Sequence, residues 1–325
     1  MKCVISQDIS AGARLIRNGE LVAFATETVY GLGANALDPE AVARIFEVKQ
    51  RPYFDPLIVH VSNINQLDQL TFGLSKQAEK LAEQFWPGPL TLVLPKKEII
   101  PDLVTSGLDS VAIRIPAHPV VRQLLDAAKL PIAAPSANKF GCLSPTQAQH
   151  VAEQLGNEIK LILDGGACSV GVESTVVQCI GDIPVILRPG GISLEEIESC
   201  IGQVRLAAIE DHAEANSPLS PGMLPRHYAP RTRLFIVNKP EDVPAKGVNG
   251  LLSLYPLEET FLKGFQFSAQ EILSPTGDLK VAAGKLFTAL RNLDAAGIDN
   301  IVALLMPEKG LGRTINNRLE RAAIS

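Results

Sequence analysis

A lysine and an arginine stand two positions apart in the stretch KQRPYFDPLIVHV, residues 49–61, directly before an apolar run. The preceding residues 39–49 have the apolar spacing of a helix, and Lys49 falls on its inward-facing stripe. We therefore expect the amine of Lys49 to point into the protein. A buried lysine beside Arg51 requires a negatively charged partner, because an isolated buried charge is very costly. The alternative is that Lys49 interacts only with the C-terminal dipole of its own helix.

Two further arginines occur in predicted strands. Arg114 lies within VAIRI, residues 111–115, on the face opposite to the apolar side chains. An arginine inside a sheet usually pairs with a carboxylate, which could be a structural Asp or Glu or the carboxylate of an amino-acid substrate. Arg188 ends the strand-like run VILR. With Lys49 and Arg51, these side chains place four cations at the strand edges of one domain.

Short polar side chains lie at the edges of several predicted strands. Hydroxyl and amide groups at such positions commonly form turns, but they are also the donors that a phosphate or a ribose requires. Together with the four cations they predict a concave anion-binding site. The residues concerned are Ser136, Asn138, Ser144, Thr146, Ser174 and Thr175.

The stretch TETVYGLGANA, residues 26–36, contains a GxGxxA spacing after a predicted strand. A dinucleotide-binding fingerprint requires a helix that begins on these glycines and an acidic residue about 20 positions later. Here the helix begins near Pro39 and the next strand contains His60, so an NAD-dependent oxidoreductase is disfavoured. The alternative is that residues 26–28 present side chains at a strand end, where the glycines let the backbone approach a ligand.

Strand-like apolar runs alternate with helix-like stretches over roughly the first 200 residues, which predicts an α/β domain. Some connections are too short for a crossover between parallel strands, so we expect a mixed sheet. Helices are expected at residues 39–49 and 75–86. Strands are expected at residues 21–26, 57–61, 90–94, 111–115, 131–134, 161–164, 174–179 and 185–188.

The length of 325 residues suggests two domains. Residues 208–232 contain four prolines and little apolar periodicity, which is typical of a linker. We therefore expect a first domain at residues 1–207, a linker at 208–232 and a smaller α/β domain at 233–325. In the smaller domain, strands are expected at residues 233–238, 250–255 and 301–306, and a helix at 279–297.

Composition limits the possible functions. A net charge of −5 argues against a nucleic-acid coat or a binder of anionic membranes, since both normally need a basic excess. The five cysteines are scattered without CxxC spacing, which indicates reduced thiols rather than a disulfide framework or a zinc site. The N-terminal stretch MKCVISQDIS lacks the apolar segment of a signal peptide, and no apolar run is long enough to span a membrane. We therefore expect a cytoplasmic protein without a membrane partner.

A series of motifs along the chain resembles the YrdC domain, in the same order and at compatible spacing. The motifs are ATETVYGLGANA, KQRP, DPLIVHV, FWPGPLTLVL, VAIRIPAHP, PIAAPSAN, SPT, GVESTVV and LRPGGIS. The Lys-x-Arg…Ser-x-Asn signature is present as Lys49, Arg51, Ser136 and Asn138. SPGMLPRHYAP and EKGLGRTINNRLERAA are similar to the linker and the C-terminal domain of Sua5 proteins, the longer form of this family. The resemblance covers nearly the whole chain.

The resemblance implies a twisted, mixed α/β sheet with a large positive cavity, followed by a smaller Rossmann-like domain. It also implies a nucleotidyltransferase that joins L-threonine, bicarbonate or CO₂, and ATP into L-threonylcarbamoyladenylate, with release of pyrophosphate and water. A separate enzyme system would then modify adenosine 37 of tRNAs that read codons beginning with A. Mg²⁺ would arrive with ATP, since the sequence has no dedicated cluster of metal ligands. The implied reaction does not require a nucleophile–base pair in the protein, because nucleotidyl transfer depends mainly on positioning and charge stabilisation.

Carried over by position, the resemblance assigns residues to two subsites. Lys49 and Arg51 are expected to hold phosphate charge and to act in catalysis, and Arg114 to bind the threonine carboxylate. Asp55 stands where many relatives have Asn, and it would repel a triphosphate unless it faces Mg²⁺ or an arginine. The L-threonine subsite comprises Thr28, His60, Arg114, Ala134 and Ser174. The ATP subsite comprises Lys49, Arg51, Asp55, Ser110, Ser136, Asn138, Ser144, Arg188 and, from the linker, either His227 or Tyr228.

A non-catalytic RNA-binding module is the main alternative, since a positive cavity could bind RNA without turnover. The acidic net charge and the lack of interleaved aromatic and basic residues weigh against it. We therefore expect no strong direct binding of tRNA.

Overall fold

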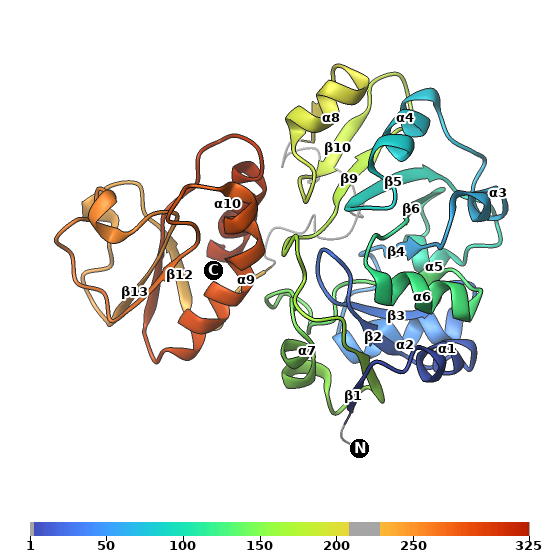
Figure 1. Ribbon diagram of the computed structural model, residues 1–325, viewed down its shortest axis with the longest axis horizontal. Helices are drawn as coiled ribbons and strands as arrows, with labels where there is room; N and C mark the ends of the chain where they lie inside the picture. The colour runs from blue at the N-terminus through green and yellow to red at the C-terminus, as the bar shows by residue number, and fades with distance from the viewer. Residues whose placement is uncertain (1–2, 208–227, 325) are drawn as a thin grey trace.

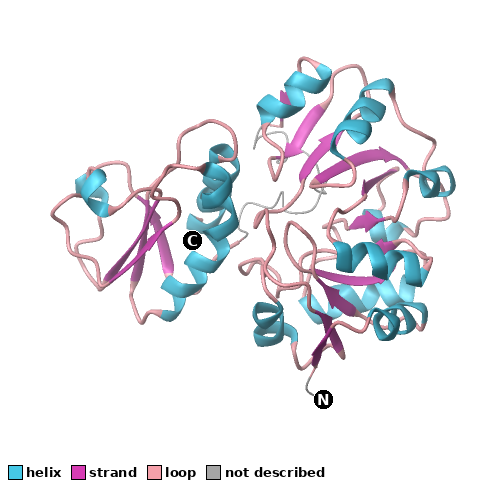
Figure 2. Ribbon diagram, viewed as in Figure 1, coloured by secondary structure: helices cyan, strands magenta, loops and turns pink. Residues whose placement is uncertain are grey.

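The computed structural model describes residues 3–207, here called the N-terminal part, and residues 228–324, the C-terminal part (Figure 1). Each part has its own sheet with helices packed around it (Figure 2). Most of the predicted linker, residues 208–227, lies outside the described residues, and so does His227. Among the helices that the structure describes, none combines the length and the apolar character needed to cross a membrane.

One sheet of eleven strands organises the N-terminal part. Its strands are β1 (Val4–Ser6), β2 (Val22–Phe24), β3 (Gly31–Asn35), β4 (Ile58–His60), β5 (Leu90–Pro95), β6 (Ser110–Arg114), β7 (Ile132–Ala133), β8 (Leu161–Leu163), β9 (Thr175–Gln178), β10 (Val185–Arg188) and β11 (Arg205–Leu206). In space they follow the order β1-β8-β2-β3-β7-β4-β6-β5-β9-β10-β11. Because β4 pairs with β6 in parallel and β5 pairs with β6 antiparallel, the prediction of a mixed sheet is confirmed.

The helix before the Lys-x-Arg motif begins and ends where the sequence predicts. Asp38 caps α2 by accepting two backbone N–H hydrogen bonds, and Pro39 is the first helical residue. Gln50 follows the helix in the left-handed conformation, at φ 53°, so α2 ends on Lys49. The helices of the N-terminal part are α1 (Ile9–Arg17), α2 (Pro39–Lys49), α3 (Leu67–Leu70), α4 (Lys76–Phe85), α5 (Asp102–Thr105), α6 (Pro119–Ala128), α7 (Ala148–Leu155), α8 (Leu194–Ile201) and the 3₁₀-helix η1 (Ile64–Gln66).

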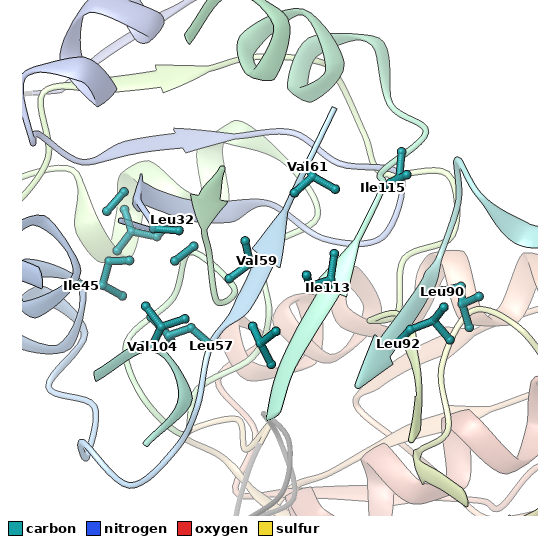
Figure 3. Close-up of a cluster of buried hydrophobic side chains, with 14 of the residues drawn as sticks. Leu32, Ile45, Leu57, Val59, Val61, Leu90, Leu92, Val104, Ile113 and Ile115 are labelled. Atoms are coloured by element: carbon teal, nitrogen blue, oxygen red, sulfur yellow. The ribbon is translucent and has the colours of Figure 1, made fainter. Parts of the chain in front are cut away.

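Side-chain alternation along β4 and β6 separates the core from the opposite face of the sheet. Val59 and Ile113 belong to the main hydrophobic cluster (Figure 3). His60 and Arg114, the next residues along each strand, are register partners and therefore share the other face. A shift of one residue would move the apolar side chains out of the core. Since each buried Val or Ile contributes about 1.5–3 kcal/mol, the core fixes the position of this histidine and this arginine.

The glycine motif forms a strand rather than the start of a helix. β3 pairs with β2 and β7 through residues 31–35. A Cβ atom on Gly33 would lie 2.5 Å from Cε1 of Phe24 and 2.7 Å from Cγ2 of Ile132, so glycine is needed here to admit packed side chains. This geometry lacks the strand-to-helix turn that a dinucleotide fingerprint requires.

The C-terminal part contains a smaller, parallel sheet. Its elements are the strands β12 (Arg233–Ile236), β13 (Asn249–Ser253), β14 (Ala269–Ile272) and β15 (Asn300–Ala303), the helices α9 (Leu279–Ala295) and α10 (Gly312–Ala323), and the 3₁₀-helices η3 (Pro240–Asp242) and η4 (Leu257–Glu259). The strands follow the order β12-β15-β13-β14, and each strand pairs in parallel with its neighbour. α9 packs on β13 and β14, and α10 packs on β12. This arrangement agrees with the expected Rossmann-like α/β unit.

α9 and α10 contribute several contacts of the C-terminal part with the N-terminal part (Figure 1). Thr314 of α10 donates a hydrogen bond from Oγ1 to the backbone oxygen of Gly190 at 2.9 Å. Gly171 lies against Gly284 of α9 so closely that a Cβ atom on Gly171 would stand 2.5 Å from the Cα atom of Gly284. The two backbones therefore approach each other through a pair of glycines.

We predict that Gly171→Ala lowers the melting temperature more than Gly166→Ala does. Both glycines have positive φ, +72° and +80°, so an alanine strains the backbone at either position, by about 1–2 kcal/mol. Only the alanine at 171 would also collide with α9, because no atom lies within 4 Å of a Cβ on Gly166. Thermal unfolding of both variants measures the difference. Equal losses would show that the contact between the two parts contributes nothing to stability.

Candidate active site

A pocket formed mainly by the N-terminal part, with Tyr228 from the C-terminal part, gathers residues that are far apart in the sequence. Its charged side chains are three arginines and one glutamate, which makes it suited to anions. The lining consists of Thr26, Thr28, Val29, Gly31, Arg51, Ile58, His60, Arg114, Ala134, Pro135, Ser136, Glu173, Ser174, Arg188 and Tyr228.

Nine of the predicted site residues line this pocket. They are Thr28, Arg51, His60, Arg114, Ala134, Ser136, Ser174, Arg188 and Tyr228. Five others lie outside the lining, namely Lys49, Asp55, Ser110, Asn138 and Ser144. The remaining candidate, His227, lies outside the described residues.

Lys49 lies behind the pocket. The residue is 1% exposed, and its amine donates hydrogen bonds to the backbone oxygen of Ser136, at 2.6 Å, and to that of Asn138. Burial and the neighbouring charge of Arg51 lower the pKa of this amine well below its usual value. The inward orientation of Lys49 is confirmed, but its direct partners are two carbonyl oxygens rather than an anion. Lys49 therefore ties the end of α2 to the Ser-x-Asn segment.

Arg51 lines the pocket and has its counterion behind it. Its Nη2 lies 2.8 Å from Oδ2 of Asp55, and both side chains are almost completely buried. Nε and Nη2 also donate to the backbone oxygens of Asp55 and Pro56, at 3.1 and 2.9 Å. The Nη1 group has no hydrogen-bond partner among the described residues and is the part of Arg51 that can meet a ligand. Asp55 thus faces an arginine, which removes the repulsion that it would otherwise exert on a phosphate.

Arg114 is likewise held by a carboxylate. Its Nη2 donates to Oε1 of Glu27 at 2.7 Å, its Nη1 to Oγ1 of Thr28 at 2.9 Å, and its Nε to the backbone oxygen of Gly88 at 3.2 Å. Burial opposes the ionisation of Glu27, but the charge of Arg114 and its hydrogen bond outweigh burial and lower the pKa of this carboxyl. These contacts use three of the five N–H groups of Arg114 and leave one on each terminal nitrogen. A structural carboxylate therefore occupies one side, and a second anion can bind the remaining N–H groups.

His60 presents a neutral ring to the pocket. The residue is 4% exposed, and its ring stands edge-on to that of Phe24, with 6.2 Å between the ring centroids. Burial and the charge of Arg114 lower the pKa of His60 to about 3. The Nδ1 atom is buried without a hydrogen-bond partner among the described residues. Near pH 7 the ring can therefore exchange hydrogen bonds with a ligand, but it does not supply positive charge.

Ser174, directly before β9, and Arg188, the last residue of β10, form one wall of the pocket. Nη2 of Arg188 donates to the backbone oxygen and to Oγ of Ser174, at 3.0 and 3.2 Å. Oγ of Ser174 also shares a hydrogen bond of 2.7 Å with Oγ1 of Thr91. A Cβ atom on Gly190 would lie 2.3 Å from the carbonyl carbon of Ser174, so only glycine lets the RPGG turn pack on this wall.

Glu173 is the one acidic side chain in the described lining. Its Oε1 accepts a hydrogen bond from Oγ of Ser144 at 2.6 Å, and its Oε2 accepts one from Nε of Arg318 at 2.8 Å. Arg318 belongs to α10, and its guanidinium carbon lies 4.8 Å from the ring centroid of Tyr228. Burial opposes the ionisation of Glu173, but Arg318 and Arg188 outweigh burial and lower its pKa. Ser144 thus contacts the pocket only through Glu173.

Asn138 and Ser110 support neighbouring segments. Nδ2 of Asn138 donates to the backbone oxygens of Lys139 and Cys142, at 2.8 and 2.9 Å, and so closes a short loop. Ser110 begins β6 opposite Pro95 of β5. Direct contact of either residue with a ligand stays a prediction. Across the described part of the chain, no three His, Cys, Asp or Glu side chains come together as metal ligands.

Fold and site together define a two-part α/β protein whose larger, mixed sheet carries an arginine-lined pocket. A family model described as "Telomere recombination" (Sua5_yciO_yrdC) matches residues 14–190. A second, described as "Threonylcarbamoyl-AMP synthase, C-terminal domain", matches residues 192–324. The chain belongs to the Sua5/YciO/YrdC family and has its Sua5-type C-terminal domain.

Relatives of nearly full length come from distant organisms. The chain is 46% identical to a protein of Pyrococcus abyssi and 45% identical to one of Bacillus subtilis, over 97% of this chain and over 94% and 92% of theirs. Both are named threonylcarbamoyl-AMP synthase. The crystal structure of Pyrococcus abyssi Sua5 complexed with L-threonine superimposes with a TM-score of 0.90, at 43% identity, over 99% of this chain and 97% of that one. Escherichia coli YciO, at 22% identity and a TM-score of 0.50, shares the fold over 58% of this chain.

Two carboxylates of the site, Glu173 and Glu27, were not predicted from the sequence as site residues. Glu173 directly precedes Ser174 in GVESTVV, and its charge within that motif is the signal that points to it. Glu27 is one of the polar residues 26–28 at a strand end. Nothing in the sequence indicates that it pairs with Arg114, which is 87 positions away.

We predict that Lys49→Met destabilises the protein as well as the site. The change leaves two backbone carbonyls without their donor, and each unpaired buried group costs roughly 1–3 kcal/mol. Thermal unfolding should show a clear drop, while the exposed control Lys76→Met on α4 should unfold like the parent protein. An unchanged melting temperature for Lys49→Met would mean that Lys49 acts only on a ligand.

We predict that the imidazole of His60 stays neutral from pH 8 to pH 5. An ordinary histidine, and His60 in the unfolded chain, takes up a proton near pH 6.5, whereas folded His60 does so only near pH 3. Because the unfolded state binds this proton first, His60 contributes stability that is complete above pH 6.5 and is lost as the pH falls toward 3. NMR of labelled histidine, assigned with His60→Gln, measures the titration. A midpoint near 6.5 would contradict the buried, neutral ring.

Proposed function

We propose that this protein is a threonylcarbamoyl-AMP synthase, a nucleotidyltransferase that makes L-threonylcarbamoyladenylate from L-threonine, bicarbonate and ATP. The observation that carries the proposal is the near full-length similarity to proteins of this name. The pocket supports it, because three arginines meet there beside a neutral histidine. In this proposal residues 1–207 form the catalytic domain, 208–232 the linker and 233–325 the C-terminal domain.

L-Threonine is proposed to bind along β4 and β6. The two remaining N–H groups of Arg114 receive the substrate carboxylate. The N–H of Ala134 already donates to the backbone oxygen of Ile58, so the backbone oxygen of Ala134 is the group left to accept from the substrate amine. His60 is placed to exchange a hydrogen bond with the hydroxyl. Thr28 and Ser174 complete the subsite at its two sides.

ATP is proposed to bind on the side of Arg51 and Arg188. Nη1 of Arg51 and the guanidinium of Arg188 meet phosphate oxygens, and Ser136 and Tyr228 meet the rest of the nucleotide. Lys49 acts through the Ser-x-Asn segment that it holds. Ser110, Asn138 and Ser144 stay in the proposal as residues that shape this side of the pocket. Mg²⁺ enters bound to ATP, as part of the substrate.

The reaction needs charge stabilisation rather than a covalent protein intermediate. The neutral amine of threonine forms a C–N bond to the carbon of bicarbonate or CO₂ and gives a carbamate. With bicarbonate, the C–O bond to hydroxide breaks, and the hydroxide takes up the amine proton and leaves as water. A carbamate oxygen then bonds to the α-phosphorus of ATP, while the bond from that phosphorus to pyrophosphate breaks. The arginines stabilise the phosphate charge that moves in this step.

The product is a mixed anhydride and therefore reactive toward water. We propose that it passes to a tRNA threonylcarbamoyl transferase system, for modification of adenosine 37 in tRNAs that read ANN codons. The expected compartment is the cytoplasm, where both ATP and tRNA are present.

Pyrophosphate release tests the proposal directly. The purified protein should release pyrophosphate from ATP only when threonine and bicarbonate are both present, and each omission should lower the rate to background. Replacing L-threonine by L-valine, which lacks the hydroxyl, should lower the rate by about tenfold or more, because a buried hydrogen-bonding group is then left unpaired. Pyrophosphate release at the same rate without threonine would refute the proposal.

A further inference from the structure

Glu173 poses an electrostatic problem for the proposed ATP subsite. Its carboxylate lines the pocket, and the residue is only 6% exposed. At a short distance, and screened by little water, a carboxylate repels a phosphate strongly. A pocket that receives a triphosphate must therefore neutralise this charge.

The neutralising charge comes from the other part of the molecule. Arg318 of α10 is fully buried, and its Nε lies 2.8 Å from Oε2 of Glu173. Its Nη2 donates to the backbone oxygen of Pro189 at 2.9 Å, next to Arg188 of the pocket wall. Its guanidinium carbon also lies 4.8 Å from the ring centroid of Tyr228, a second lining residue. The side chain of Arg318, from the C-terminal part, thus contacts two lining residues of the pocket, Glu173 and Tyr228.

We infer that Arg318 is a positioning residue for ATP, through which α10 neutralises Glu173 and fixes the ring of Tyr228. Arg318 itself is not among the lining residues, so it acts through the side chains that it touches. The C-terminal part therefore completes the ATP subsite. This inference rests on the proposed function, because it assumes that the pocket receives a triphosphate.

Docking of the two parts is the competing explanation for Arg318, and the same helix offers a control. Arg313 of α10 forms an ion pair with Glu195 of α8, across the same interface. Neither of these two residues lines the pocket. Arg313→Met therefore removes a docking contact and leaves the charge of the pocket unchanged.

The test compares four variants of the full chain: Arg318→Met, Glu173→Gln, the double variant and Arg313→Met. Equilibrium dialysis with Mg²⁺ and ATP gives the dissociation constant, and steady-state pyrophosphate release gives KM for ATP and for threonine. Arg318→Met should weaken ATP binding by about tenfold or more, because Glu173 loses its ion-pair partner, with a smaller change in KM for threonine. The double variant should recover binding to within about threefold of the parent protein. Arg313→Met should bind ATP like the parent.

Each outcome decides the inference. It is overturned if Arg318→Met binds ATP as tightly as the parent, or if a folded double variant does not recover binding. It is also overturned if Arg313→Met loses as much affinity as Arg318→Met. If Arg318→Met does not fold, the double variant alone decides. Both substituted positions are neutral in the double variant, so it should bind ATP. If the parent protein binds ATP but these comparisons fail, only this inference is refuted. If the parent protein binds no ATP, the proposed function is refuted as well.

Discussion

Two of the three arginines that line the pocket, Arg51 and Arg114, are each buried against an internal counter-charge. A buried charge without a partner would cost several kcal/mol of stability, and the site contains more than one buried charge. Asp55 forms an ion pair with Arg51 from within the same loop, and Glu27 forms an ion pair with Arg114 from the end of another strand. These pairs bind one part of each guanidinium and leave other N–H groups toward the pocket. The carboxylates thus neutralise and orient these two arginines, while a ligand receives the remaining donors.

The fold supplies the scaffold that makes such pairing possible. Strand alternation puts Val59 and Ile113 in the core and turns His60 and Arg114 to the opposite face. Where segments must approach very closely, glycine is present, as at Gly190 against the backbone of the neighbouring wall. The C-terminal part reaches the same pocket through Tyr228, which lines it, and through Arg318 of α10 behind the lining. The site therefore depends on contacts between segments that are distant in sequence, and no single motif contains it.

Much of this could be predicted from the sequence, and what could not has a physical reason. The apolar stripe of residues 39–49 predicted a helix that ends on an inward-facing Lys49, because periodicity is a local property of the chain. The buried strand β3 was missed because two of its glycines break the apolar pattern, although they serve packing. The partners of Lys49 were missed for another reason. Backbone carbonyls leave no trace in side-chain types, so the sequence favoured an anion beside Lys49.

The most direct measurement is a crystal structure of the protein with L-threonine, Mg²⁺ and a non-hydrolysable ATP analogue. The account predicts phosphate oxygens within about 3 Å of Nη1 of Arg51 and of Arg188, and the threonine carboxylate at Arg114. It also predicts that Asp55 and Glu27 keep their arginines when the ligands are bound. A nucleotide bound elsewhere, or arginines that leave these carboxylates to reach the ligand, would contradict it.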